Sequence, residues 1–470
     1  MRTVFTRRQI WILAVVHVIT AAMLLGVFFY RPARDGGKPT AANPSDGGTA
    51  ETPADHDKFR AARILDESVM LETNLGGSGN ESVTAAFELS GRLYLFGETD
   101  SQNYDFEGRS EGENTFLIIT DLALKPLFYK TFKGGFAKCA HFNTAFLLMT
   151  KSERAAELFA LDASGTAVLQ KEIPLETGEV PLDFVYGYDE QSAVTAIDEI
   201  VVAVQMNLKS EPQKKIKLIP FDADFKQKTG RIIYNAYALE YIAGFPYGAG
   251  YAFAVNMRSD IGSHMALIVC ESPLTLPHKL IPYELNSGRD YLAARVTPYS
   301  GGFAALIIDA DGSADILTVG FDLNAAQIIL LPPHKAKSGE LFFDDYEGVF
   351  YVYTRSQTDL GRFIEVNPDG PRTTAYDTFS TCRSLTAYRA ARGAAYFGCK
   401  NMPSPYVAVR YGAGRFSEFA FGGKSENIAE LIPFPVDGYI IAVCTSAAKN
   451  SKVGGNFGGD DIWLVKIRYE

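Results

Sequence analysis

The acidic segment Asp309–Asp315 is the candidate for metal chemistry. It reads Asp-Ala-Asp-Gly-Ser-Ala-Asp, so that Asp309, Asp311 and Asp315 surround a central glycine. Oxygen ligands at alternating positions around a glycine can wrap a calcium ion. A calcium loop of the EF-hand type would need a later Glu and a helix on each side, whereas this segment lies between two predicted strands. Asp-Gly is also a strong hairpin signal, and a hairpin turn is the favoured interpretation.

A second acidic segment, residues 100–113, predicts a binding loop. Asp100, Asp105 and Glu107 are its candidate ligand-binding residues, and two aromatic residues lie among them. The segment is longer than a hairpin needs, and long loops often have a function. It could bind a cation, a sugar or a basic partner. The alternative is an acidic loop that is only solvated.

No catalytic residue is predicted. The serines lack a Gly-x-Ser-x-Gly elbow, and the six histidines are scattered along the chain. Glycoside hydrolysis needs only two carboxylates at the right separation, which distant parts of a chain can supply. The candidates for such a pair are acids of predicted loops and strand ends: Asp260, Glu284, Asp290, Asp344 and Asp345. The alternative for each of them is a solvated loop acid, and no cofactor is predicted.

Two of the five cysteines are candidates for a disulfide. Cys382 and Cys399 fall on two strands of one predicted hairpin whose turn lies near Ala391, so the two side chains could face each other. A cross-strand bridge would require an exported domain. The favoured alternative is two buried thiols, because free cysteine is commonly buried.

Residues 61–470 consist of short apolar runs separated by Gly, Pro, Asn and Asp. The runs are rich in β-branched and aromatic residues, which predicts strands. Many runs are apolar throughout, which indicates strands covered on both faces. The blades of a β-propeller stack face to face and bury their middle strands in this way. The sequence therefore predicts an all-β propeller domain.

Eight units of about 50 residues are predicted, each with four strands, and seven blades with one misassigned unit is the alternative. The chain ends one strand short of a full unit, and residues 68–75 supply the missing outer strand, so strands from both termini would close the ring. The second strand of each unit is the clearest: Leu93–Gly97, Ala145–Met149, Ile200–Gln205, Tyr251–Asn256, Phe303–Ile308, Val349–Tyr353, Ala394–Gly398 and Tyr439–Cys444.

Two segments fit this scheme less directly. Residues 152–158 read locally as a capped helix start, but a hairpin and a third strand are predicted there because the residues that follow fit a strand. Residues 176–191 are longer than their place in the repeat and are predicted to be an insertion loop.

The last unit carries the strongest repeat signature. Asp437–Ser446 reads Asp-Gly-Tyr-Ile-Ile-Ala-Val-Cys-Thr-Ser, and Asp461–Lys466, after a Gly-rich loop, reads Asp-Ile-Trp-Leu-Val-Lys. A weaker copy lies between residues 91 and 135. The pattern resembles the repeat of bacterial secreted β-propeller proteins, with Gly-Gly-Tyr-Ile-Val-Ala-Gly-x-Thr and Asp-x-Trp-Leu-Val-Lys strands. The resemblance covers two units well and the six middle units only by strand order. It implies a propeller fold and export, but no single activity.

Residues 10–30 are predicted to form a transmembrane signal-anchor helix. The stretch carries no formal charge with histidine neutral, and it is about long enough to cross a bilayer. Three arginines in the predicted cytoplasmic segment 1–9 favour a C-terminal domain outside the cytoplasm. Residues 31–60 are predicted to be a flexible linker, rich in Gly, Pro and Ala. A cleavable signal peptide is the alternative for the apolar stretch.

The charge distribution limits the class of partner. Residues 1–34 contain five Arg and no acidic residue, whereas the whole chain has a net charge of −10. A domain this acidic is not expected to bind nucleic acid. The leading hypothesis is a membrane-tethered extracytoplasmic platform for a protein or glycan partner. A carbohydrate-active enzyme at the cell surface and a ligand-sensing ectodomain with a membrane partner are the alternatives.

Overall fold

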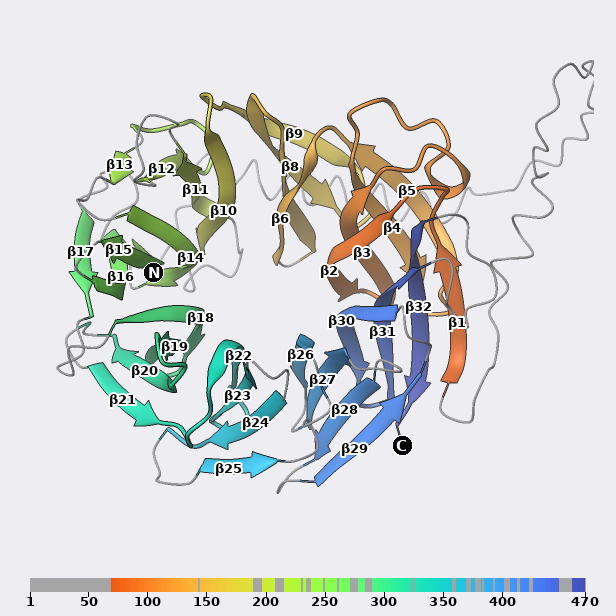
Figure 1. Cartoon of the computed structure of the whole chain (residues 1–470). Helices are drawn as coiled ribbons and strands as arrows, with labels where there is room; N and C mark the ends of the chain where they lie inside the picture. Colours follow the sequence, from red (N-terminus) through yellow and green to blue (C-terminus); the bar gives the residue numbers. More distant parts are fainter. Residues whose placement is uncertain are drawn as a thin grey trace, which may run out of the picture. The chain divides into compact units, whose positions relative to one another are not determined.

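The computed structural model describes residues 69–469 apart from short internal gaps, the longest of which are 189–196 and 448–458. These residues belong to one compact unit. The described strands form eight four-stranded antiparallel sheets, arranged as the blades of a ring in Figure 1. The predicted all-β propeller with eight blades is confirmed, and the alternative of seven blades is wrong.

The first four blades contain sixteen strands, each blade running outward from its first strand. Their bounds are β2 (Glu81–Leu89), β3 (Arg92–Thr99), β4 (Thr115–Asp121) and β5 (Pro126–Phe132); β6 (Gly135–Phe142), β7 (Ala145–Lys151), β8 (Ala155–Asp162) and β9 (Ala167–Pro174); β10 (Glu179–Tyr188), β11 (Ile197–Met206), β12 (Lys215–Asp222) and β13 (Arg231–Ile233); β14 (Ala238–Tyr247), β15 (Gly250–Ser259), β16 (Gly262–Cys270) and β17 (His278–Pro282).

The other four blades follow the same order, and the last one takes its outer strand from the start of the described chain. Their bounds are β18 (Tyr291–Tyr299), β19 (Gly302–Asp309), β20 (Ala314–Gly320) and β21 (Ala326–Leu330); β22 (Ala336–Asp344), β23 (Val349–Ser356), β24 (Gly361–Val366) and β25 (Thr373–Tyr376); β26 (Ser384–Ala391), β27 (Ala394–Lys400), β28 (Tyr406–Tyr411) and β29 (Arg415–Ala420); β30 (Glu426–Phe434), β31 (Tyr439–Ala447), β32 (Asp460–Arg468) and β1 (Val69–Leu75).

Strand β1 closes the ring as predicted. It pairs antiparallel with β32, with Leu75 opposite Ile462. The indole Nε1 of Trp463 donates a hydrogen bond of 3.0 Å to Glu72, and both residues are buried. Hydrogen bonds between the two ends of the propeller therefore hold the last blade together.

The core lies between the blades. Every predicted second strand is the second strand of a blade, and the apolar residues of these strands are almost fully buried. The described residues form eight hydrophobic clusters, each made by two neighbouring blades. Apolar burial of this kind is the main favourable term in folding, and here it is spread evenly around the ring.

Of the two predictions made for the segments that fitted the repeat less directly, one is confirmed and the other is wrong. The segment after residue 152 is a turn followed by the third strand β8, as predicted. The insertion loop predicted at 176–191 is wrong, because most of it is β10, the inner strand of the third blade. Phe184 and Val185 are buried there, but Gly and Pro on both sides of them hide the strand pattern in the sequence.

Each inner strand carries a β-bulge against its second strand in the first half of its length. The register shifts fall at residues 83/85, 136/138, 181/183, 241/243, 293/295, 336/338, 385/387 and 428/430. A bulge bends its strand and leaves one residue out of the pairing. The bulge is thus a repeated feature of the ring that the amino-acid repeat does not reveal.

The structure does not describe the predicted membrane segment. Residues 10–30 lie outside the described residues, as do the predicted segments 1–9 and 31–60. Among the residues that the structure describes, no helix has the length and apolar character that crossing a membrane requires.

Candidate functional site

The loop that joins β1 to β2 is fixed by side chains of the β3–β4 loop. Five consecutive amides, those of residues 76–80, each donate a hydrogen bond to a side-chain oxygen. Four of the acceptors lie within the predicted binding loop, and the fifth belongs to β2: Asp105, Glu81, Asn103, Ser101 and Asp100, in order of the amides. We call residues 76–80 the closure loop, because they join the last blade to the first.

The closure loop needs glycine where it approaches the β3–β4 loop. A Cβ atom on Gly77 would lie 2.5 Å from the Cβ of Ser101, which is too close for two carbon atoms. The amide of Gly79 donates to the Oγ of Ser101 over 2.7 Å. The run Gly-Gly-Ser-Gly-Asn is the sequence signal for this approach, but its partner Ser101, 22 residues after Gly79, could not be identified from sequence.

Glu81 is the buried carboxylate beneath the closure loop. It is 1% exposed, and its Oε1 accepts a hydrogen bond of 2.7 Å from the hydroxyl of Thr99. Burial raises the pKa of Glu81, and the nearby charge of Asp100 acts in the same direction. Hydrogen bonds from Ser101, Thr99 and the Gly77 amide favour the charged form, but burial outweighs them.

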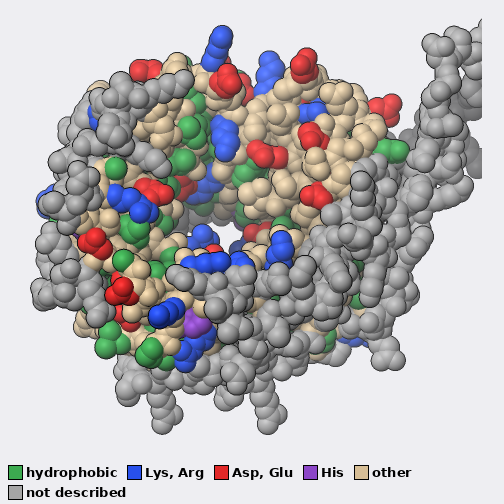
Figure 2. All heavy atoms as spheres, in the orientation of Figure 1, with side chains coloured by type: hydrophobic (Ala, Val, Ile, Leu, Met, Phe, Trp, Pro, Cys, Tyr) green, Lys and Arg blue, Asp and Glu red, His purple; other side chains and the backbone are tan. Residues whose placement is uncertain are grey.

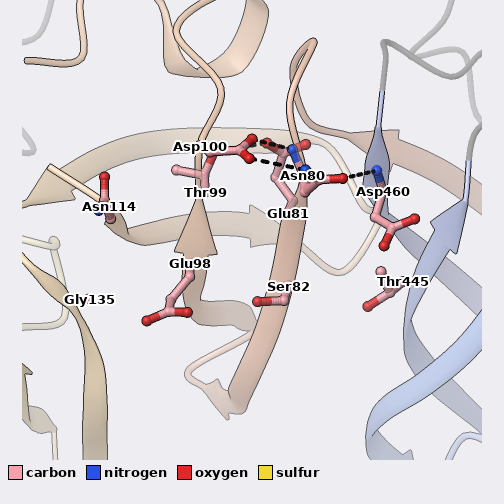
Figure 3. Close-up of a pocket in the computed structure, with 10 residues that line it drawn as sticks. All are labelled: Asn80, Glu81, Ser82, Glu98, Thr99, Asp100, Asn114, Gly135, Thr445 and Asp460. Carbon is pink, nitrogen blue, oxygen red and sulfur yellow. Dashed lines mark hydrogen bonds between the residues drawn. The ribbon is translucent and has the colours of Figure 1, made fainter. Parts of the chain in front are cut away.

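A recess of about 340 Å³ opens beside the closure loop, between the last blade and the first two (Figure 3). Three of its four carboxylates, those of Glu81, Glu98 and Asp100, accept hydrogen bonds from backbone amides. The Oε1 of Glu98 accepts from the amide of Phe136 over 2.8 Å, and Asp100 accepts from Asn80. The lining residues are Asn80, Glu81, Ser82, Glu98, Thr99, Asp100, Asn114, Gly135, Thr445 and Asp460. This arrangement is an acidic surface on a fixed backbone.

The predicted ligand-binding residues divide between two roles. Asp105 is buried and accepts from the Gly76 amide over 2.9 Å, so it positions the closure loop. Asp100 and Glu107 are exposed, and Asp100 lines the recess. Arg109 is the only basic residue of segment 100–113, and it donates to the carbonyl oxygen of Asp100 over 3.0 Å. The loop is therefore both a structural clamp and an acidic surface, and ligand binding stays a prediction.

The predicted metal segment is a turn between β19 and β20. The Oδ1 of Asp309 accepts from the amide of Ser313 over 2.8 Å, and the Oδ1 of Asp315 accepts from the amide of Leu331 over 3.0 Å. Asp311 is exposed. Within the described ranges, no three His, Cys, Asp or Glu side chains stand close enough together to hold a metal ion. The segment is therefore the turn of a hairpin, which was the favoured interpretation of the sequence.

The candidate glycosidase acids do not come together where the structure describes them. Asp290 is exposed before the first residue of β18, whereas Asp344 and Asp345 lie at the last residues of β22 and just beyond. Inner strands run in the same direction in every blade, so these acids lie on opposite faces of the ring. Asp344 is buried, and its Oδ1 accepts from two amides of its own turn. Asp260 and Glu284 lie outside the described residues.

Cys382 and Cys399 are both buried in one hydrophobic cluster. The pairing of Ala391 with Ala394 and the bulge in β26 place Leu385, not Cys382, opposite Cys399. The predicted cross-strand placement is thus shifted by three residues. The Sγ of Cys382 lies 3.2 Å from the carbonyl oxygen of Ser384, to which it donates. A bridge between the two cysteines stays a prediction.

Known proteins resemble this chain in fold rather than in sequence. No family model and no curated protein matches the chain. Solved structures do match. Sqt1 from Chaetomium thermophilum is 9% identical, with 87% of this chain and 100% of that chain covered and a TM-score of 0.51. The Dos1 propeller is 10% identical, with 84% and 94% covered and a TM-score of 0.50.

The chain is an eight-bladed β-propeller. Dihydro-heme d1 dehydrogenase NirN, in complex with DHE, is similar over 90% of this chain and 82% of its own, with 10% identity and a TM-score of 0.50. At these identities, the likeness shows the fold alone. The specific bacterial repeat remains a resemblance, carried by the first and last units of the propeller.

Proposed function

We propose that this propeller is a binding platform tethered outside the cell membrane by residues 10–30, and that the acidic surface around the closure loop docks a basic segment of a protein partner. The supporting observation is the segment 100–113. It has five acidic residues and one basic residue, a net charge of −4, on a backbone fixed by the closure loop.

The fixed backbone favours binding. A loop that is already ordered loses little conformational entropy when a partner binds, so more of the contact energy becomes affinity. The exposed carboxylates of Glu107 and Glu111 carry the charge of this surface. An acidic surface also attracts a basic partner from a distance and raises the rate of encounter.

The same geometry argues for binding over hydrolysis at this recess. A glycosidase needs one carboxylate as acid and another as base or nucleophile, each free to exchange a proton or attack. Glu98 accepts from a backbone amide, and Asp100 accepts from the amide and the side chain of Asn80. Glu98 thus links the first blade to the second, and Asp100 holds the closure loop, which are structural tasks.

The test is a cross-linking pull-down of the full-length chain from native membranes. The test variant combines Glu107→Lys with Glu111→Lys on the β3–β4 loop. The matched control combines Asp345→Lys with Glu347→Lys, which are exposed on the β22–β23 turn and undergo the same change of charge. We expect a partner that is recovered with wild type and control, lost with the test variant, and released by salt.

Two outcomes would contradict the proposal. One is recovery of the same partner by residues 1–58 alone, because the propeller would then be dispensable. The other is equal recovery by both double variants, because the charge of the β3–β4 loop would then play no part. A glycan captured through the same residues would replace the protein partner.

A further inference from the structure

A second recess, of about 440 Å³, lies in the wall of the central channel. Three successive inner strands, β10, β14 and β18, supply most of its lining, and Asn256 of β15 supplies the rest. Figure 2 shows the ring hollowed at its centre, with Lys and Arg side chains gathered around the opening. This recess is separate from the acidic surface at the closure loop, and it does not depend on the function proposed there.

Small side chains and bulged backbone create the space. Ala243, Ala293 and Ala294 line the recess at the bulges of β14 and β18. A bulge bends its strand and leaves one residue outside the strand pairing, which widens the wall at this point. Elsewhere around the channel, long side chains such as Arg389 occupy the inner strands.

The charged groups of the wall are paired with opposite charges. Asp183 contacts the ammonium group of Lys138 and accepts a hydrogen bond from the hydroxyl of Tyr241. Glu240 pairs with Arg258 over 3.1 Å. Each of these two carboxylates of the lining thus has a basic side chain beside it.

The third pair joins Arg295, which lines the recess, to Glu340 of the next inner strand, β22. The Nε of Arg295 lies 3.4 Å from an Oε of Glu340. This contact uses one of the five N–H donors of the guanidinium group. The side chains of Arg295 and Glu240 are 56% and 43% exposed, so both are accessible to a ligand, whereas that of Asp183 is only 11% exposed.

The wall is held rigidly. The Oδ1 of Asn256 accepts from the amide of Ala293 over 2.9 Å, and its Nδ2 donates to the carbonyl oxygen of the same residue over 3.0 Å. The Nε2 of Gln205 donates to the carbonyl oxygen of Leu239 over 3.2 Å. These bonds fix the inner strands at the recess, so little order must be gained when a ligand enters.

We propose that the channel recess binds an uncharged carbohydrate. A sugar hydroxyl donates and accepts hydrogen bonds at once, which matches a wall that presents both carboxylate acceptors and guanidinium donors. An ionic ligand would compete with an existing ion pair for its partner, whereas a neutral hydroxyl adds to the pair. The volume lies within the range of about 300–1,000 Å³ that is usual for small-molecule sites.

The test uses the purified full-length chain and an array of neutral oligosaccharides built from hexoses and N-acetylhexosamines. The best binder is then measured by calorimetry against wild type and variants. Arg295→Gln removes donors at the recess while keeping a polar side chain, and we expect it to lower affinity by about tenfold or more. Ala294→Leu fills the space, and we expect it to abolish binding.

The matched control is Arg389→Gln. Arg389 pairs with Glu430 over 3.1 Å between two other inner strands, so the change is chemically the same but lies outside the recess. We expect it to leave affinity unchanged. Each variant is checked by its thermal unfolding. The proposal is overturned if no neutral oligosaccharide binds, if Arg295→Gln and Arg389→Gln act alike, or if folded Ala294→Leu protein binds as wild type does.

Discussion

Asn256 in β15 holds the backbone of Ala293 in the next blade with two hydrogen bonds, of 2.9 Å and 3.0 Å. The same relationship recurs at other blade interfaces. Glu98 accepts a hydrogen bond from the amide of Phe136. Gln205 donates to the carbonyl oxygen of Leu239 and accepts from the amide of Tyr241. In each case a polar residue near the end of a second strand binds the next inner strand at its bulge. The blades are therefore joined by directional bonds as well as by apolar packing.

Asn256→Leu should lower the free energy of unfolding by about 2 kcal/mol or more, because it leaves the buried N–H and C=O of Ala293 without their partner. Asn207→Ala is the control, since Asn207 is exposed one residue beyond β11. It should change stability by less than about 0.5 kcal/mol. Urea unfolding measures both, and similar losses in the two variants would show that the cross-blade bonds contribute little.

Ser101→Ala tests the closure loop. It removes the acceptor of the Gly79 amide and a donor to Glu81, and it should cost about 1–3 kcal/mol. Ser78→Ala is the matched control, because the exposed Ser78 takes part through its amide alone. Hydrogen exchange of β1 should accelerate in the first variant and stay unchanged in the second. Unchanged exchange in both would argue that β1 is held by β32 alone.

Glu430→Gln should make stability less sensitive to pH. Burial raises the pKa of Glu430 above its ordinary value near 4.5, although Arg389 opposes this shift. The contribution of Glu430 to stability is then complete below its unfolded-state pKa and is lost as pH rises through the folded-state pKa. Relative to wild type, the variant should gain stability as pH rises from about 4 to 7.

Urea unfolding at several pH values measures this effect, with the exposed Glu153→Gln as the control variant. A stability difference between wild type and Glu430→Gln that stays constant with pH would mean that the Arg389 ion pair offsets the burial. A difference that moves in favour of wild type as pH rises would mean that the pair outweighs it.

Cys382 and Cys399 should react with iodoacetamide only after the propeller unfolds. Both are buried, and the strand register places Leu385 opposite Cys399. Peptide mapping by mass spectrometry without reducing agent measures this directly. A peptide that contains both cysteines joined by a disulfide would instead support the bridge considered from the sequence, and it would require the backbone before β26 to shift.

Much of the fold was predictable because it depends on local patterns. Continuous apolar runs mark the eight second strands, since these strands are buried on both faces wherever they lie in the ring. The missing fourth strand of the last unit predicts that residues 68–75 close the propeller, because an unpaired strand edge is costly. The prediction failed at β10, where Gly and Pro interrupt the apolar run and an insertion loop was expected instead of a strand.

The candidate site depended on contacts that no local pattern encodes. The sequence shows a glycine-rich run at residues 76–80 and an acidic loop at 100–113, but only the tertiary structure shows that the second binds the amides of the first. Bulges in the inner strands shift register by one residue, and this alters every cross-strand pairing beyond them, including that of Cys399. Sequence alone determined the all-β propeller and favoured eight blades over seven, because apolar runs mark strands that are buried. Tertiary structure decided the number of blades and which side chains meet, because strand register and blade order set those contacts.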